Sequence, residues 1–332
     1  MKKILMLTVC AFCLILTGCG KYDKKDLIKD LSSKINNSKG YYVSGTLEMV
    51  NNDDKYSYDV NVSYSADNNF KVSLRNKNNN HEQIILRNEE GVYVLTPSLN
   101  KSFKFQSEWP YNNSQSYILQ NVISDIKDDN NLKFKTTKNG YILTTTVNYP
   151  SNKDLVKQKI YIDKKTNITQ IEVLDDDNQV HIKMVFDSID LKAKYNKKYF
   201  TLKENMTSAN IKEEIETTSK IEDIIYPMYI PANTRLTSQD AVEKENGERI
   251  ILTFDGDKPF MLVQETVSKE DEMTTVLVDG DPLIIADSVA AVNDYSVNWL
   301  SNGIEYYVVS SDLNSEELIN VAASIAVMPV GK

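Results

Sequence analysis

The sequence predicts a mainly β protein of the α+β type: a long, curved antiparallel sheet wrapped around a few covering helices, followed by a smaller α+β domain. Two observations carry this prediction. Apolar and polar residues alternate along many short segments that are separated by turns of Asn, Asp and Gly. The balance of charge also changes sign along the chain, which indicates a boundary between two domains.

Composition excludes several classes of protein. The chain has 332 residues, of which 41% are hydrophobic and 26% charged, so it can build a core and is not disordered as a whole. A formal net charge of −9 argues against a nucleic-acid partner, because binding phosphates needs a basic surface. The two histidines, His81 and His181, and three cysteines leave little material for a zinc site, a histidine-based triad or a disulfide framework. We therefore predict no catalytic residues, no metal and no cofactor.

The first residues predict secretion and a lipid anchor. Lys2 and Lys3 precede an apolar run, residues 4–16, which is too short to span a membrane and fits a signal peptide over residues 1–18. The run ends in Leu-Thr-Gly-Cys, which resembles a bacterial lipobox, so we expect Cys19 to carry diacylglycerol and to become the new N-terminus. Two acyl chains would hold the protein on the extracytoplasmic face of the cell membrane. The alternative is an ordinary cleaved signal with an unrelated cysteine.

Charge divides the body of the protein into two parts. Residues 19–205 hold 28 Lys and Arg against 24 Asp and Glu, a net charge of +4, whereas residues 206–332 hold 8 against 23, a net charge of −15. We predict a first domain at 19–205, a polar linker at 206–220 and a second domain at 221–332. The step in charge has two interpretations: two unrelated solvated surfaces, or a mildly basic face toward anionic lipid or wall polymer.

The first domain is expected to begin with a helix that has Asp23 as N-cap, an apolar stripe at Leu27, Leu31 and Ile35, and Gly40 just beyond its end. Ser114 is the expected N-cap of a second helix at residues 118–126. Strands with period-two alternation are expected around residues 58–64, 70–74, 103–105, 141–149 and 180–186.

One face of this sheet is predicted to be concave and apolar. Its candidate ligand-binding residues share one parity and are Tyr58, Val60, Val62, Phe70, Val72, Phe103 and Phe105. If the helices leave the concave face open, it forms a groove for an apolar ligand. If they cover it, the same residues form an ordinary filled core.

The second domain is expected to contain strands at 250–254, 260–264 and 274–278, and then two strands joined by an Asn-Gly turn at 302–303. A final helix should start at Asn314, which forms a capping-box pattern with Glu317. Two Asp-Gly-Asp segments, at 255–257 and 279–281, are interpreted as hairpin turns, because neither has the ligand spacing of a calcium loop. His181 is expected to face solvent, since its parity is opposite to that of Ile182.

One stretch carries a family resemblance. Residues 91–110, Gly-Val-Tyr-Val-Leu-Thr-Pro-Ser-Leu-Asn-Lys-Ser-Phe-Lys-Phe-Gln-Ser-Glu-Trp-Pro, resemble a signature of the YdcC-type sporulation lipoproteins of Gram-positive spore formers. That family is similar to the LolA/LolB/RseB superfamily and to the germination lipoprotein GerS. The resemblance extends from the lipobox to about Asn205 and is specific over residues 84–126. It implies a half-barrel sheet with a helical lid, no catalysis and a concave apolar groove.

The resemblance leaves two functions open. In LolA-type carriers the groove holds acyl chains, although those carriers are not lipidated and Cys19 departs from their pattern. In GerS-like members the domain instead serves as the partner of a cell-wall amidase. The strand-turn-strand-helix ending of the chain resembles a domain appended to such lipoproteins, which implies a docking role. We therefore expect a lipid-anchored protein of the sporulation or germination envelope that binds an acyl chain or apolar peptide. The alternative is an interaction partner or activator of a cortex amidase, with a filled groove.

Overall fold

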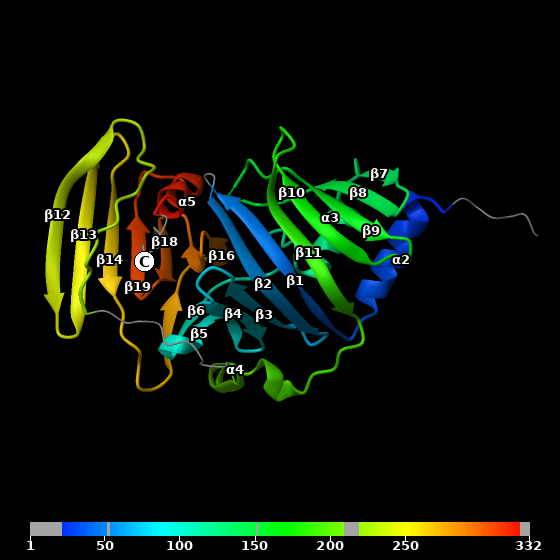
Figure 1. Cartoon of the computed structure of the whole chain (residues 1–332), viewed down its shortest axis with the longest axis horizontal. Helices are drawn as coiled ribbons and strands as arrows, with labels where there is room; N and C mark the ends of the chain where they lie inside the picture. The colour runs from blue at the N-terminus through cyan, green and yellow to red at the C-terminus, as the bar shows by residue number, and fades with distance from the viewer. Residues whose placement is uncertain (1–21, 52–53, 151, 209–218, 326–332) are drawn as a thin grey trace, which may run out of the picture.

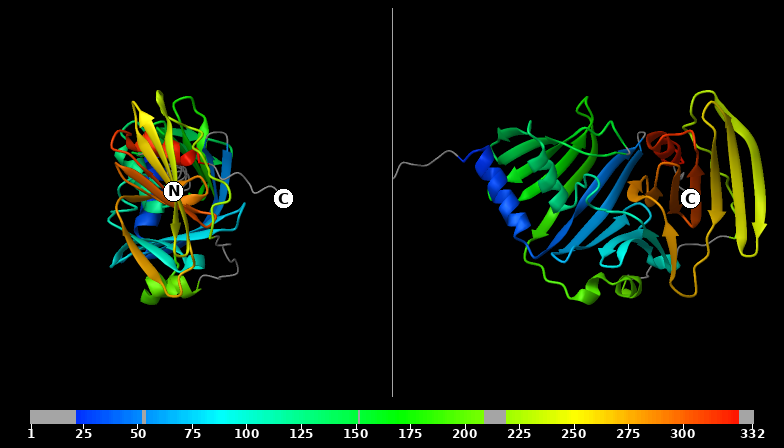
Figure 2. Two further views of the ribbon diagram at one scale, coloured as in Figure 1. Left: turned by 90° about the vertical axis from the view of Figure 1, so that its left-hand side faces the viewer. Right: turned by 180° about the vertical axis from the view of Figure 1, so that it is seen from behind.

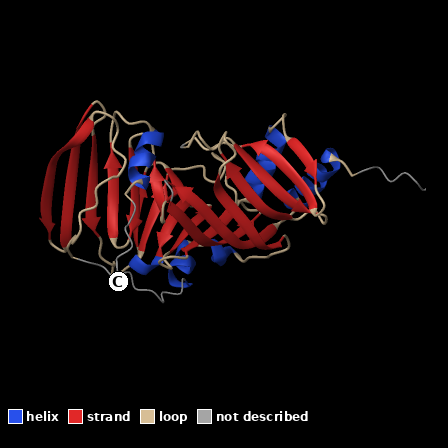
Figure 3. Cartoon of the chain, turned by 45° about the horizontal axis from the view of Figure 1, so that its top comes forward, coloured by secondary structure: helices blue, strands red, loops and turns tan. Residues whose placement is uncertain are grey.

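A computed structural model describes residues 22–51, 54–150, 152–208 and 219–325 of the chain. Strands dominate this part of the protein, and the few helices lie against the sheets (Figure 1, Figure 3). The strands form one sheet of 12 strands and one of 7. The mainly β class predicted from the alternation of residues is confirmed. The predicted signal peptide and Cys19 lie outside the described residues.

The large sheet is an open, curved, almost wholly antiparallel sheet in the order β15-β6-β5-β4-β3-β2-β1-β11-β10-β9-β8-β7. Its strands are β1 (Gly40–Asn51), β2 (Asp54–Ser65), β3 (Asn69–Asn76), β4 (Glu82–Asn88), β5 (Gly91–Thr96), β6 (Lys101–Phe105), β7 (Lys133–Thr136), β8 (Gly140–Thr146), β9 (Lys157–Asp163), β10 (Ile168–Leu174), β11 (Val180–Asp190) and β15 (Thr274–Val278). Strands β1 and β11 pair across a bulge at Ser44 and Gly45. A Cβ at Gly45 would collide with the carbonyl oxygen of Val185, so this bulge requires glycine.

The second sheet has the order β12-β13-β14-β19-β18-β17-β16. Its strands are β12 (Thr234–Lys244), β13 (Gly247–Gly256), β14 (Phe260–Thr266), β16 (Asp281–Ile285), β17 (Ser288–Val292), β18 (Ser296–Ser301) and β19 (Ile304–Val309). Helix α5 (Ser315–Ala323) packs on this sheet. The predicted capping box is present, with the Asn314 side chain accepting from the Glu317 amide at 3.0 Å.

Two helices cover the inner face of the large sheet (Figure 2). Helix α2 (Lys24–Asn36) begins at the predicted cap, where Asp23 accepts from the amides of Lys25 and Asp26. Helix α3 (Leu119–Asp128) has Ile118 as N-cap, without a side-chain cap. The prediction of Ser114 as the cap was therefore wrong. The Ser114 hydroxyl instead donates to the half-buried carboxylate of Asp125 at 2.9 Å, because a carboxylate is a stronger acceptor.

The outer face of β4 and β5 is also covered, by the 3₁₀ turn η3 (Lys197–Phe200) and helix α4 (Leu202–Ser208). Phe200 and Met206 pack there against Leu86 and Tyr93. The predicted boundary between residues 205 and 206 falls within α4, and most of the predicted linker lies outside the described residues. In the described part of the chain, each helix is too short or too polar to cross a bilayer.

Candidate functional site

The seven residues predicted to line a groove lie on one face of the large sheet. The pairing register aligns Val62 with Val72 in the neighbouring strand, and the same face continues across the sheet to β6. Six of them, Tyr58, Val60, Val62, Phe70, Val72 and Phe105, are at most 5% exposed, and Phe103 is partly buried against the same core. This face is packed under α2, α3 and the fully buried Trp109, whose ring meets Phe70 edge-on.

The second sheet closes one end of this face. The turn between β16 and β17 carries Ala286 in a left-handed conformation, with φ of 50°, and its backbone faces the large sheet. Ala286 accepts a hydrogen bond from the Tyr58 hydroxyl at 2.5 Å. Gln83 Oε1 accepts from the Val289 amide at 2.7 Å and from the Ser288 hydroxyl at 3.1 Å. Ile284, Val289 and Ala291 of this hairpin pack into the core of the large sheet.

Strand β15 makes a second connection between the large sheet and the C-terminal part of the chain, in addition to the β16–β17 turn. Residues 274–278 were expected to form a strand of the second domain, but they pair in parallel with β6 of the large sheet. The Ser102 hydroxyl bonds the Thr275 hydroxyl at 2.7 Å, which supports this pairing. As a result, the Asp-Gly-Asp segment at 279–281 connects the two sheets and is not a hairpin turn. The segment at 255–257 ends β13 and begins the turn to its paired strand β14.

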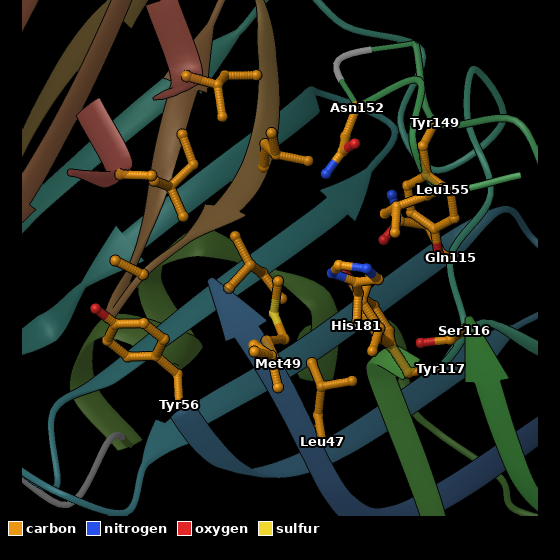
Figure 4. A pocket seen from close by; sticks show the side chains of 18 of the residues that line it. Leu47, Met49, Tyr56, Gln115, Ser116, Tyr117, Tyr149, Asn152, Leu155 and His181 are labelled. Atoms are coloured by element: carbon orange, nitrogen blue, oxygen red, sulfur yellow. The ribbon is translucent and has the colours of Figure 1, made fainter. Parts of the chain in front are cut away.

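An apolar pocket lies where the rim of the large sheet meets β16 and α5 (Figure 4). Its cavity volume is about 120 Å³. The lining residues come from six regions of the chain and include Met49, Tyr56, Leu155, Ile284 and Ile319. None of the seven predicted groove residues lines it. Because its walls come from strands and a helix far apart in sequence, no local pattern could have predicted it.

His181 lines this pocket, so the prediction that it faces solvent was wrong. Its side chain is 33% exposed, and its Nε2 lies 2.8 Å from Asp175 Oδ2. Strand β11 has a bulge here, since Val173 pairs with Ile182 and Leu174 with Val180, so strict alternation is broken and both His181 and Ile182 line the pocket. The hydrogen bond with His181 is the main cause that holds the pKa of Asp175 below its usual value.

Three half-buried titratable groups that lie outside the pocket have shifted pKa values. Burial raises the pKa of Asp125 to about 6, although Ser114 and Gln158 donate hydrogen bonds to its carboxylate. Burial lowers the pKa of His81 to about 4, and its Nε2 has no hydrogen-bond partner. Burial also raises the pKa of Asp287, beside the turn that docks on Tyr58. Within the described residues, no cluster of three or more His, Cys, Asp and Glu side chains is arranged to hold a metal ion.

These features define the class of protein: a two-sheet, mainly antiparallel β protein whose curved sheet wraps around two helices and is closed at one end by its own C-terminal part. A family model described as "Sporulation protein YdcC-like" matches residues 1–200. The sporulation protein YdcC of Bacillus subtilis strain 168 is 33% identical over 334 residues, which cover 98% of each chain. The chain therefore belongs to the YdcC-like family of sporulation proteins, as the signature at residues 91–110 indicated.

Solved structures show a more distant likeness. The MucA/MucB complex of Pseudomonas aeruginosa contains a chain 10% identical, with a TM-score of 0.32, over 90% of this chain and 96% of that one. The complex of the CwlD amidase with the GerS lipoprotein of Clostridioides difficile contains one 17% identical, with a TM-score of 0.24, over 53% of this chain and 98% of that one.

Proposed function

We propose that this sporulation protein is anchored by lipid at Cys19 on the extracytoplasmic face of the membrane, and that it acts by binding a protein partner. The observation that carries the proposal is the closed inner face of the large sheet. Helices α2 and α3 and the β16–β17 turn occupy the space that an acyl chain would need, and the Tyr58 hydroxyl is already bonded to Ala286. This packing supports a filled groove, which we expect of an interaction protein.

The partner that we propose is a cell-wall amidase, the kind of enzyme named in the complex with GerS. The apolar pocket of Figure 4 is the proposed seat for one apolar side chain of that partner. At about 120 Å³ the pocket is smaller than the roughly 300–1,000 Å³ typical of ligand sites. It is closer to an apolar cavity of about 150 Å³ that holds benzene. Its size therefore favours an apolar peptide over a long acyl chain.

Two variants test the pocket. Met49→Trp would fill it, whereas Val180→Trp places the same bulk on the neighbouring β11, outside the pocket and 38% exposed. With a purified sporulation amidase from the same organism, we expect wild type and Val180→Trp to co-elute with the enzyme, and Met49→Trp to bind at least about tenfold more weakly. Stoichiometric uptake of a fluorescent fatty acid by the wild type, without amidase binding, would contradict the proposal and favour the lipid-binding function.

The anchor is tested separately. Cys19→Ala should move the protein from the membrane fraction to the soluble fraction, because two acyl chains supply the stable attachment. Retention of Cys19→Ala in salt-washed membranes would mean that Cys19 is not the anchor.

A further inference from the structure

The end of the molecule where the described chain begins is fixed to the large sheet. The Tyr22 ring packs on Tyr141 of β8 with 5.5 Å between centroids, and Lys24 Nζ donates to the Leu132 carbonyl at 2.6 Å. Cys19 precedes Tyr22 by three residues, which can span at most about 10 Å. If Cys19 carries lipid as proposed above, this short tether holds the start of α2 close to the bilayer surface.

That end of the molecule is rich in lysine. Helix α2 with its flanking residues, the β7–β8 hairpin and the β9–β10 turn lie together, since Lys34 Nζ donates to the Lys165 carbonyl at 2.6 Å. We define the α2-end surface by the lysines of these segments: Lys24, Lys25, Lys29, Lys34, Lys39, Lys133, Lys135, Lys138, Lys164 and Lys165. All of them except Lys24 are exposed. None of them forms an ion pair within the described part of the chain.

The acidic residues of the same segments are engaged locally. Asp23 and Asp26 cap α2, Asp30 accepts from the Tyr22 hydroxyl at 2.9 Å, and Asp163 accepts from the amides of Lys165 and Asn167 at 2.8 Å. Ten lysines against these four aspartates leave a net positive surface. The second sheet lies at the opposite end of the long axis (Figure 1), and residues 206–332 carry a net charge of −15.

From this arrangement we infer that the α2-end surface lies against the anionic headgroups of the membrane that the anchor enters. An anionic bilayer attracts the lysine-rich end and repels the acidic end, so the charge asymmetry and the tether favour the same orientation. The long axis then points away from the membrane, and the pocket beside β16 and α5 lies away from the bilayer surface.

Protection of a sheet edge is the competing explanation for part of this surface. Strand β7 is an edge strand, and lysines on an edge discourage another strand from pairing with it. This accounts for Lys133 and Lys135 but not for Lys29 on the helix or Lys164 and Lys165 in a turn.

The test uses the chain from Gly20 to Lys332, which contains every described residue and carries no lipid. Its sedimentation is measured with vesicles of phosphatidylcholine alone and with vesicles that also contain phosphatidylglycerol. We expect binding only to the anionic vesicles, weakening as salt shortens the Debye length. Each lysine near an anionic surface contributes roughly fivefold to partitioning. Lys29→Glu/Lys133→Glu/Lys135→Glu should therefore bind at least about 100-fold more weakly.

The matched control is Lys197→Glu/Lys198→Glu/Lys203→Glu, which makes the same change of charge in exposed residues of η3 and α4. It should retain most of the binding. Equal loss in both variants, equal binding to neutral vesicles, or binding to an anionic wall polymer but not to vesicles would overturn the inference. Because this protein carries no lipid, vesicle binding tests the α2-end surface alone. Fractionation of Cys19→Ala tests the anchor alone, so either proposal can be contradicted while the other stands.

Discussion

Tyr58 and Ala286 are 228 positions apart in the sequence, yet the Tyr58 hydroxyl donates a 2.5 Å hydrogen bond to the Ala286 carbonyl oxygen. The bond ties β2 of the large sheet to the β16–β17 turn. It lies beside the two bonds that Gln83 accepts from Ser288 and Val289. Since Tyr58 is only 2% exposed, water does not compete strongly for this carbonyl. The two sheets are therefore joined by buried polar contacts as well as by β15.

Tyr58→Phe should lower the free energy of unfolding by about 1–3 kcal/mol, because it leaves the partly buried Ala286 carbonyl without this donor. Tyr42→Phe is a matched control: its hydroxyl donates to Asn61 Oδ1 at 2.7 Å, but the residue is only half-buried. We expect Tyr42→Phe to lower the free energy of unfolding, measured in urea, by less than about 1 kcal/mol. Equal costs for the two variants would show that the Tyr58 bond does not hold the turn in place.

Phe103→Asp separates the two interpretations of the inner face. Phe103 packs against the core of the large sheet, so a carboxylate there should destabilise the protein by about 2–4 kcal/mol. Gln106→Asp, three residues further on and exposed, should change the stability by less than about 0.5 kcal/mol. A Phe103→Asp protein with wild-type thermal stability that has lost uptake of a fluorescent fatty acid would instead support an open groove.

Local patterns predicted about half of the strands of the large sheet, among them β2, β3, β6, β8 and β11, because these strands alternate between wet and buried residues. The alternation through Tyr58, Val60 and Val62 reproduces the observed face of β2, and the caps at Asp23 and Asn314 follow from short-range hydrogen bonds. No strand was predicted at β12, since its side chains are exposed on both faces and show no alternation. The position of β15 depends on pairing with β6, more than 160 residues earlier, which periodicity does not contain.

The candidate pocket was not predicted for the same reason. Met49, Leu155 and Ile319 are each ordinary apolar residues within their own elements, and only the docking of α5 and β16 brings them together. The groove prediction followed the correct face of the sheet. Whether that face is open depends on how α2, α3 and the β16–β17 turn seat on it, which is a matter of tertiary packing.

Limited proteolysis tests the predicted domain division. We expect cleavage within residues 209–220, where the sequence is polar and follows the buried Asn205 and Met206 of α4. The two fragments should still co-elute on size exclusion, because β15 pairs with β6 and the Tyr58–Ala286 bond spans the division. They should separate in urea. Fragments that dissociate without denaturant would show that the contacts between the sheets are weak.

His81 should make the stability depend on pH. Burial lowers its pKa to about 4 from an ordinary value of 6.5, so the unfolded chain binds the proton more readily than the folded one. Its contribution is present above about pH 6.5 and is lost as pH falls toward 4, a change of about 2–3 kcal/mol. His81→Leu should remove this loss in urea unfolding at several pH values. If the free energy of unfolding of His81→Leu still fell by the same amount between pH 6.5 and 4, another group would be responsible for that fall.

Asp125 should have the opposite effect on the pH dependence of stability, over the same range of pH. Burial raises its pKa to about 6 from 3.8, so the folded chain holds the proton more tightly than the unfolded one. Its contribution to stability is fully present below about pH 4 and is lost as pH rises through 6, again by about 2–3 kcal/mol.

Asp125→Asn keeps an oxygen to accept from the Ser114 hydroxyl and removes the charge, so it should stabilise the protein at pH 7. Asp154→Asn, which removes one exposed carboxylate outside helix α3, is the control and should leave the profile unchanged. Because His81 and Asp125 oppose each other, the wild type should show a flat profile between pH 4 and 6 that tilts one way in His81→Leu and the other way in Asp125→Asn. If the stability of both variants changed with pH in the same direction, the opposite effects assigned to His81 and Asp125 would both be wrong.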